Sequence, residues 1–348
     1  MTNTTRGAAT PGSAPFLWEA KAATTMARPA PPRPYHHRPG GGFRNPPGSP
    51  PRRAGLRDML KFLLWDMRRA KLPPIPPGLA SSSKPDLAAL AENEIAWLGH
   101  ACFAMRLGGK LVLTDPYLGE HAGPFGFGPK RFLPPAVTAA ELPKLDLIVI
   151  SHNHYDHIDT AALKAYRWRA ETTVVCPLGL AKLLRKLGFA QVTELDWWDD
   201  YRFDSLTITA LPAVHFSGRG LFDRDKTLWS SMALASPTRK VWFGGDTGYG
   251  EVFREIGERA GPFDLALVGI GAYEPRIIME ASHATPEEGV MIARDIGAKA
   301  AVGMHWGSIM LTPEDPFEAP DRFRRAALEQ QYGDANAWIM QVGEVRNF

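Results

Sequence analysis

The sequence has little cysteine, almost no net charge and no long hydrophobic run. Only Cys102 and Cys176 occur, both inside apolar runs, so we expect them to pack as small hydrophobic side chains in a reducing compartment. The 40 basic residues are nearly balanced by 37 acidic ones, so no overall field favours nucleic acid as a partner. No stretch of about 18 apolar residues exists to span a bilayer, and no compact apolar core of a secretory signal precedes residue 30. These absences together predict a cytoplasmic protein.

The first 51 residues differ in composition from the rest of the chain. They hold 11 of the 31 prolines, with many Gly, Ser, Thr and Ala. Such a segment buries too little apolar surface to offset the entropy that is lost on ordering. We therefore predict that residues 1–51 are disordered, with partial order at most between Tyr35 and Asn45. The adjacent His36 and His37 are expected in a solvated loop.

Residues 52–93 combine a basic amphipathic segment with a proline-rich connector that follows residue 71. Apolar residues recur at helical spacing at Leu56, Met59, Leu60, Leu63, Leu64 and Met67, and the stripe is widened by Phe62 and Trp65. Seven basic residues between 52 and 71 face only two acidic ones. A basic helix with a broad apolar face suits an anionic membrane surface. A helix packed on the main domain, with its basic side in solvent, would show the same pattern, and both interpretations stay open.

From residue 94 to 348, short apolar runs alternate with amphipathic stretches. Strands are predicted over 94–98, 101–107, 110–114, 145–151, 172–176, 205–211, 229–235, 239–245, 264–269, 299–304 and 338–345. Helices are predicted over 159–168, 178–187, 250–259, 285–296 and 317–330. Hairpin strands in the first half, followed by strand–helix units, predict an α/β domain with two mixed sheets and helices outside.

The segment SHNHYDH, residues 151–157, concentrates three imidazoles and a carboxylate directly after an apolar run. His152 and His154 have the spacing that can close on one metal ion, and Asp156 and His157 can face a second. Imidazole together with carboxylate suits Zn, Mn or Fe(II). The segment therefore predicts a metal site at the end of a buried strand.

Three further metal-competent side chains each follow a strand-like run. His215 follows residues 206–211, Asp246 follows residues 241–245, and His305 follows residues 300–304. Ligands at strand ends lie on rigid elements at one edge of a sheet, where loops converge. These three residues would complete the ligand set of a two-metal site.

This order of ligands resembles the metallo-β-lactamase superfamily, whose signature is an HxHxDH loop followed by His, Asp and His. Within it, residues 94–348 are similar to the N-acylphosphatidylethanolamine-hydrolysing phospholipase D family. The segments GPKRF (128–132), ELDWW (194–198) and IGAYEPR (270–276) carry this narrower resemblance, since they have no part in binding metal. The resemblance implies an αβ/βα sandwich with the metals at one edge between the sheets.

The resemblance also implies the roles of the site residues. Two Zn²⁺ ions are expected, with Mn and Fe also compatible. One metal would be held by His152, His154 and His215, the other by Asp156, His157 and His305, and Asp246 would bridge. A hydroxide between the metals would hydrolyse N-acylphosphatidylethanolamine to phosphatidate and an N-acylethanolamine. The catalytic residues would be Asp246, Asp156 and His283, of which His283 would contact phosphate or donate a proton.

Other residues are candidates to orient the metal ligands or to line the substrate groove. Asp115 is a candidate to orient a ligand imidazole, although a turn Asp before proline explains it equally well, and His100 is a candidate neighbour of the ligands. An acyl groove lined by aromatic side chains is expected from Trp197, Trp198, Phe222, Tyr273 and Trp306.

The expected partners are a phospholipid substrate and an anionic membrane surface, with the protein peripheral on the inner face of the membrane. No nucleic acid is expected, and a homodimer stays open. One alternative is a metallo-hydrolase of a soluble lactone or sugar-phosphate-like substrate on the same fold. Another is a peripheral membrane-binding module with structural metals, but such sites are closed and need only four ligands.

Overall fold

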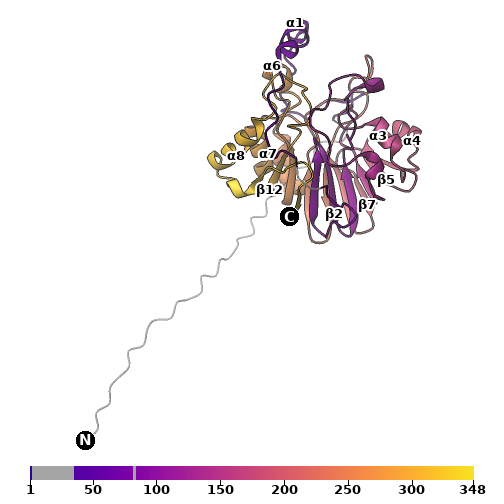
Figure 1. Cartoon of the computed structure of the whole chain (residues 1–348), viewed down its shortest axis with the longest axis vertical. Helices are drawn as coiled ribbons and strands as arrows, with labels where there is room; N and C mark the ends of the chain where they lie inside the picture. The colour runs from indigo at the N-terminus through magenta and orange to yellow at the C-terminus, as the bar shows by residue number, and fades with distance from the viewer. Residues whose placement is uncertain (2–34, 81–83) are drawn as a thin grey trace. The chain divides into compact units, whose positions relative to one another are not determined.

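Two mixed β-sheets form the centre of the protein (Figure 1). The computed structural model describes residue 1, residues 35–80 and residues 84–348. The first sheet has seven strands in the order β14 (Val345–Asn347), β1 (Glu94–Gly99), β2 (Cys102–Leu107), β3 (Lys110–Thr114), β4 (Leu147–Val149), β5 (Thr173–Pro177) and β6 (Gln191–Leu195). Strands β14 to β3 pair antiparallel, and β3 to β6 pair parallel.

The second sheet repeats this plan. Its order is β13 (Ala337–Trp338), β12 (Ala298–Met304), β11 (Phe263–Gly269), β10 (Lys240–Phe243), β9 (Ser231–Ala235), β8 (Leu206–Leu211) and β7 (Asp200–Phe203). Strands β7 to β10 pair antiparallel, and β10 to β13 pair parallel. Strands β8, β10 and β12 therefore run in the same direction and end at one edge of the sheet.

Side-chain alternation gives each strand of the first sheet two buried faces. In β2, Phe103 and Met105 point into the core between the sheets, whereas Cys102 and Ala104 point to the layer under the helices. The core between the sheets also holds the fully buried Trp242 of β10. Because both faces are covered, the strands are continuously apolar, as in buried sheets generally.

Helices cover the outer faces of both sheets (Figure 1). The first sheet is covered by α3 (Thr160–Ala165) and α4 (Ala181–Lys186), and the second by α5 (Val252–Ala260), α7 (Pro286–Asp295) and α8 (Ala319–Glu329). Local signals start them: Asp159 caps α3, and Thr285 with Glu288 forms a capping box on α7. Short turns of helix complete the list, namely α6 (Arg276–Met279), η2 (Pro124–Gly126), η3 (Ala139–Glu141) and η4 (Asp334–Asn336). The predicted α/β sandwich of two mixed sheets flanked by helices is confirmed.

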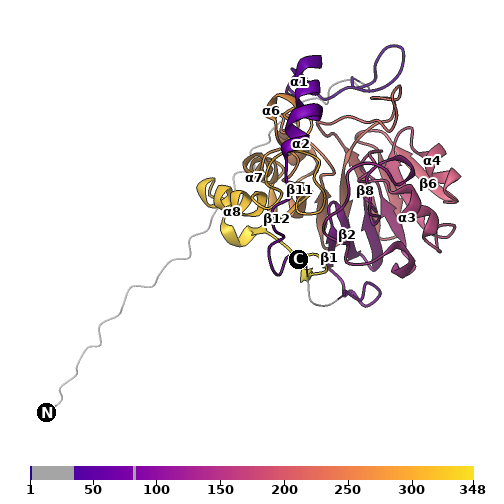
Figure 2. The ribbon, with the colours of Figure 1, turned by 45° about the horizontal axis from the view of Figure 1, so that its top comes forward.

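The basic segment forms a continuous helical stretch with its apolar side in solvent. It consists of α1 (Leu56–Lys61), a π-helical turn η1 (Phe62–Asp66) and α2 (Met67–Arg69). Only Phe62 is buried, while Leu56, Leu60, Leu63, Leu64 and Trp65 are between 47% and 77% exposed. Figure 2 shows this stretch beside α6. The packed-helix interpretation therefore does not hold for its apolar stripe. Among the described residues, no helix has the length and apolar character needed to cross a bilayer.

The prediction that residues 1–51 are disordered is wrong for their last part. Residues 2–34 lie outside the described residues, but His36, Phe43 and Pro46 are buried against the domain. His36 and His37 both pair with the carboxylate of Asp196 instead of lying in a solvated loop. A few buried rings and charge-assisted hydrogen bonds thus order a segment whose composition alone predicts disorder.

The predicted strand over 338–345 is also wrong. Strand β13 ends at Trp338 in the second sheet, and β14 begins at Val345 in the first. A turn separates them, in which the N–H of Gln341 donates to the carboxylate of Glu344 and Gly343 adopts φ +91°. The chain therefore crosses from one sheet to the other within an apolar run that reads as a single strand.

Candidate metal centre

Asp115, directly after β3, organises the loop that follows β4. Its carboxylate is fully buried and accepts hydrogen bonds from the N–H and the hydroxyl of Ser151. It also accepts the Nδ1–H of His157, at 2.6 Å. This bond directs His157 Nε2 toward the other ligands. A carboxylate that accepts the other ring N–H is the usual second partner of a metal-binding histidine. The structure thus places Asp115 in the orienting role considered from the sequence.

Arg219 braces the same loop from the other side, and sequence reasoning missed it. Its guanidinium donates to the backbone carbonyls of Asn153 and Ile158, at 2.8 and 2.9 Å, and lies over the ring of Tyr155. A lone arginine in a Gly-rich stretch carries no sequence signal for this role. The loop that carries the ligands is therefore tied down at both ends.

Three histidine nitrogens converge in the first ligand group. His154 Nδ1 lies 2.8 Å from His152 Nε2 and 3.2 Å from His215 Nε2. The opposite ring nitrogens are committed, because His152 Nδ1 contacts Ser151 Oγ and His215 Nδ1 donates to the carbonyl of Ser282, both at 2.8 Å. The lone pairs of His152 Nε2 and His215 Nε2 therefore both face His154 Nδ1, an arrangement that a cation would stabilise.

The second ligand group contains Asp156, His157 and His305. Asp156 Oδ2 lies 3.6 Å from His157 Nε2 and 3.4 Å from His305 Nε2. A third nitrogen, His100 Nε2, lies 3.0 Å from the same carboxylate oxygen. His100, expected only as a neighbour of the ligands, thus directly contacts the carboxylate and fixes its orientation.

Asp246 lies between the two groups. Its Oδ2 is 3.1 Å from His157 Nε2 and 3.7 Å from His215 Nε2, and its Oδ1 is 3.1 Å from His305 Nε2. The preceding Gly245 adopts φ +55°, and a Cβ there would lie 2.4 Å from Ser151. Only glycine therefore lets the end of β10 approach the ligand loop closely enough for Asp246 to face both groups.

The structure brings all seven predicted ligands into one cluster, and their donor atoms fit divalent cations. Tetrahedral coordination at about 2.0–2.1 Å separates neighbouring ligand atoms by about 3.3 Å, close to the spacings observed here. Within the described part of the chain, the buried atoms Asp246 Oδ1 and His305 Nε2 lie 3.1 Å apart without hydrogen-bond geometry, and neither has another hydrogen-bond partner. Buried polar atoms are rarely left unpaired, so these two point to an ion.

Electrostatics differ between the two groups. Burial lowers the pKa of His154 to about 4 and lowers the pKa of His152 and of His215 well below the ordinary value. Burial acts in the same direction on His305, but Asp246 and Asp156 outweigh it and raise the pKa of His305 to about 9. Burial also acts on His157, but Asp246, Asp156 and Asp115 outweigh it and raise the pKa of His157 well above its ordinary value. Neutral imidazoles are the form that binds metal, so the first group is ready for an ion, whereas His305 and His157 must first lose protons.

His283 lies at the rim of the cluster and is half-buried. Its ring centroid is 5.1 Å from that of His215 and 5.4 Å from that of His305. Arg276 holds its loop by donating to the carbonyl of His283 and by a bidentate bond to Glu288. Burial lowers the pKa of His283 to about 4, so its imidazole is neutral at pH 7 and presents one N–H.

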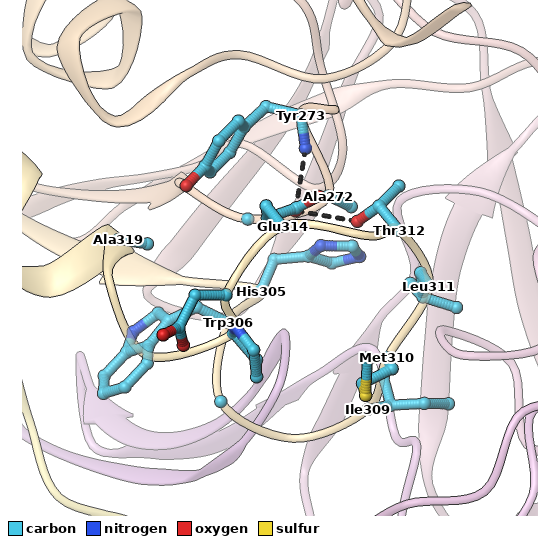
Figure 3. Close-up of a pocket in the computed structure, with 14 residues that line it drawn as sticks. Ala272, Tyr273, His305, Trp306, Ile309, Met310, Leu311, Thr312, Glu314 and Ala319 are labelled. Atoms are coloured by element: carbon cyan, nitrogen blue, oxygen red, sulfur yellow. Dashed lines mark hydrogen bonds between the residues drawn. The ribbon is translucent and has the colours of Figure 1, made fainter. Parts of the chain in front are cut away.

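A small pocket with a volume of about 20 Å³ lies beside His305 (Figure 3). Tyr273, Trp306 and Glu314 line it, and the Glu314 carboxylate accepts from the N–H of Tyr273 and the hydroxyl of Thr312. Of the five aromatic residues expected to line an acyl groove, only Tyr273 and Trp306 line this pocket.

The other three aromatic residues lie elsewhere. Trp197 is fully buried in the core, and its indole N–H donates to the carbonyl of Trp229. Trp198 stacks under the guanidinium of Arg259, and Phe222 is 91% exposed on a loop. Aromatic identity alone does not distinguish core residues from pocket walls.

A family model described as the beta-lactamase superfamily domain matches residues 110–306. An uncharacterized protein of Mycobacterium tuberculosis is 39% identical over 285 residues, covering 78% of this chain and 74% of that protein. N-acyl-phosphatidylethanolamine-hydrolyzing phospholipase D 1 of Caenorhabditis elegans is 35% identical over 313 residues, covering 84% of this chain and 88% of that protein. Among solved structures, an isothiocyanate hydrolase from Delia radicum gut bacteria shares the fold, with a TM-score of 0.59 at 20% identity over 73% of this chain and 99% of that chain.

Proposed function

The chain belongs to the metallo-β-lactamase superfamily as a metal-dependent hydrolase, and on this premise we propose that it is a phosphodiesterase of the phospholipase D type. The proposed substrate is N-acylphosphatidylethanolamine, and the products are phosphatidate and an N-acylethanolamine. The observation that carries the proposal is the placement of Asp246 between two complete ligand groups. The similarity to the C. elegans phospholipase, which spans most of both chains, supports the choice of substrate.

The ligand groups would hold two cations, most simply Zn²⁺. When bound, these ions lower the pKa of a shared water and neutralise the charge of a phosphodiester. The chain's own contribution is rigidity: Asp115, Ser151 and Ser282 fix the ligand imidazoles in one tautomer each. Ligands that are already oriented need no reorganisation during the reaction. Such preorganisation is a main source of electrostatic catalysis.

His283 is suited to bind the phosphodiester at the rim of this centre. Its neutral imidazole can donate one hydrogen bond to a non-bridging phosphoryl oxygen. Arg276 holds its backbone in place through the His283 carbonyl, at 2.8 Å. The substrate would thus be held at the rim of the cluster, beside His215 and His305.

The exposed helix of residues 56–69 supports a lipid as the substrate. Its leucines and Trp65 lie in solvent, and each such side chain gains about 1.5–3 kcal/mol on leaving water. Flanking basic residues attract anionic headgroups by about 1 kcal/mol each. The helix contacts α6, whose first residue is Arg276, so a bilayer on the helix would lie next to His283.

A lipid panel tests the proposal directly. Purified protein with measured metal content would be offered N-acylphosphatidylethanolamine, phosphatidylcholine, a lactone and a sugar phosphate. We expect close to two metals per chain, faster turnover of the N-acyl lipid, and phosphatidate with N-acylethanolamine as products. Release of diacylglycerol would place the cleavage on the other side of phosphorus, and activity on soluble substrates alone would contradict the lipid assignment.

A further inference from the structure

We propose that Asn45 and Arg52 are positioning residues for the metal ligand His215. They belong to residues 36–52, here called the N-terminal clasp, which precedes the hydrolase domain in sequence. The inference concerns metal binding and is independent of the identity of the substrate.

Both backbone groups of His215 pair with side chains of the clasp. The N–H of His215 donates to Asn45 Oδ1 at 2.9 Å, and the carbonyl of His215 accepts from Arg52 Nη2 at 3.2 Å. These contacts join residues that are 170 and 163 positions apart in sequence. His215 is fully buried and lies four residues beyond the end of β8, so no strand pairing fixes its backbone. The clasp supplies the hydrogen bonds that a strand would otherwise provide.

Arg52 is itself held in place by a buried carboxylate. Asp225 is 3% exposed and accepts from Arg52 Nη1 at 2.9 Å and from Arg52 Nη2 at 3.2 Å. Arg38, from the same clasp, donates to the same Oδ2 atom at 3.0 Å but is not among the partners of His215. A bidentate arginine has a planar, fixed direction, so its remaining hydrogen bond aims at the His215 carbonyl.

The clasp is also anchored at its other end, on Asp196 and Trp197. His36 and His37 donate to the two oxygens of Asp196, and the His36 ring stacks on Trp197 with a centroid distance of 4.2 Å. The N–H of Phe43 donates to the carbonyl of Asp225. The segment is thus fixed before and after Asn45, which keeps the amide oxygen in position.

The orientation of the His215 ring explains why its backbone hydrogen bonds to Asn45 and Arg52 affect metal affinity. His215 Nδ1 donates to the carbonyl of Ser282, so that Nε2 faces His154 and Asp246. A shift of the His215 backbone would move Nε2 out of this geometry while leaving the other two imidazoles of the group unchanged. Loss of partners that orient a ligand costs about 10- to 100-fold in metal affinity.

The test is a Zn²⁺ titration of chelator-treated full-length protein in competition with a chromophoric chelator. A His215→Ala variant identifies which binding step belongs to the first ligand group. We expect Arg52→Ala and Asn45→Leu to weaken that step by about 10- to 100-fold and to leave the other step unchanged. Arg38→Ala is the matched control, because it removes a bond to Asp225 without touching His215, and it should bind like the wild type.

Conservative variants separate positioning from folding. Asn45→Asp keeps an acceptor for the His215 N–H and should retain wild-type metal affinity. If Asn45→Leu fails to fold, the comparison of Arg52→Ala with Arg38→Ala still tests the proposal. Wild-type affinity in Arg52→Ala and Asn45→Leu would overturn the proposal. Equal weakening by Arg38→Ala and Arg52→Ala would also overturn it, since the effect would then come from Asp225 alone.

Discussion

Replacement of Asp246 by asparagine tests the centre most directly. Asp246 is 4% exposed, and its two oxygens lie 3.1 Å from His157 Nε2 and from His305 Nε2. Asparagine has nearly the same shape, so packing around Gly245 should survive. It lacks the negative charge, however, and one of its two polar atoms becomes a donor that cannot bind a cation.

The expected loss follows from the number of groups affected. Asp246 faces both ligand groups, so each group loses the one carboxylate that they share. If each loss costs about 10- to 100-fold, as is typical for weakened metal sites, the combined effect is about 10²- to 10⁴-fold in kcat. At about 1.36 kcal/mol per factor of ten, the barrier rises by about 2.7–5.4 kcal/mol.

The assay is kcat on N-acylphosphatidylethanolamine at saturating Zn²⁺, with metal content and thermal unfolding measured on the same samples. Asp204→Asn is a suitable control, because Asp204 is an exposed carboxylate that pairs only with Lys110 among the described residues. Retention by Asp246→Asn of more than about a tenth of the wild-type rate, a barrier change below about 1.4 kcal/mol, would refute the bridging role.

Three further predictions concern the membrane, the substrate and protons. Charge reversal on the exposed helix at Lys61, Arg68 and Arg69 should abolish sedimentation with anionic vesicles. Salt should weaken the wild-type interaction, because the Debye length is about 10 Å at 0.1 M. Equal binding to neutral vesicles would count against this prediction. His283→Ala should slow turnover of the lipid without loss of metal, and metal loss measured by elemental analysis would instead make His283 a ligand. Because the pKa of His305 is raised to about 9, its proton is bound at pH 7 and must leave when the metal binds. The pKa of His157 is raised as well, so metal affinity should rise with pH up to at least about 9, and calorimetry in buffers of different ionisation enthalpy should detect proton release. Absence of released protons would show that both imidazoles are neutral.

The ligands could be predicted from the sequence because their chemistry is local. His152, His154, Asp156 and His157 sit in one loop after an apolar run, and the strand that precedes them is readable from composition. The residues that orient them could not be predicted in the same way. Ser282 accepts from His215 through its backbone carbonyl, which any residue type could provide. Only the three-dimensional path of the chain reveals such a partner.

Long-range pairing also explains two of the errors in the predicted fold, which in addition omitted β6 and β7. His36 and His37 lie in a Gly- and Pro-rich stretch, and their order depends on Asp196, which is 160 residues away. Trp338 and Val345 lie in one apolar run, and which sheet each joins depends on neighbours outside that run. Local composition carries no information about either neighbour.

The two halves of the molecule exchange their flanking segments. The N-terminal clasp comes before the first sheet in sequence but packs on His215 and Asp225, which follow β8 of the second sheet, as well as on Asp196. Strand β14 comes after the second sheet and pairs with β1 of the first, joining Glu94 to Asn347. Each half therefore lacks a piece that only the other end of the chain supplies. Such pairings close very long loops, which slows folding and makes it cooperative. We expect residues 36–348 to unfold in one calorimetric transition, because β14 completes the first sheet from the far end of the chain and the clasp holds the loop that follows β8 of the second. Two separate transitions would show that the halves fold independently.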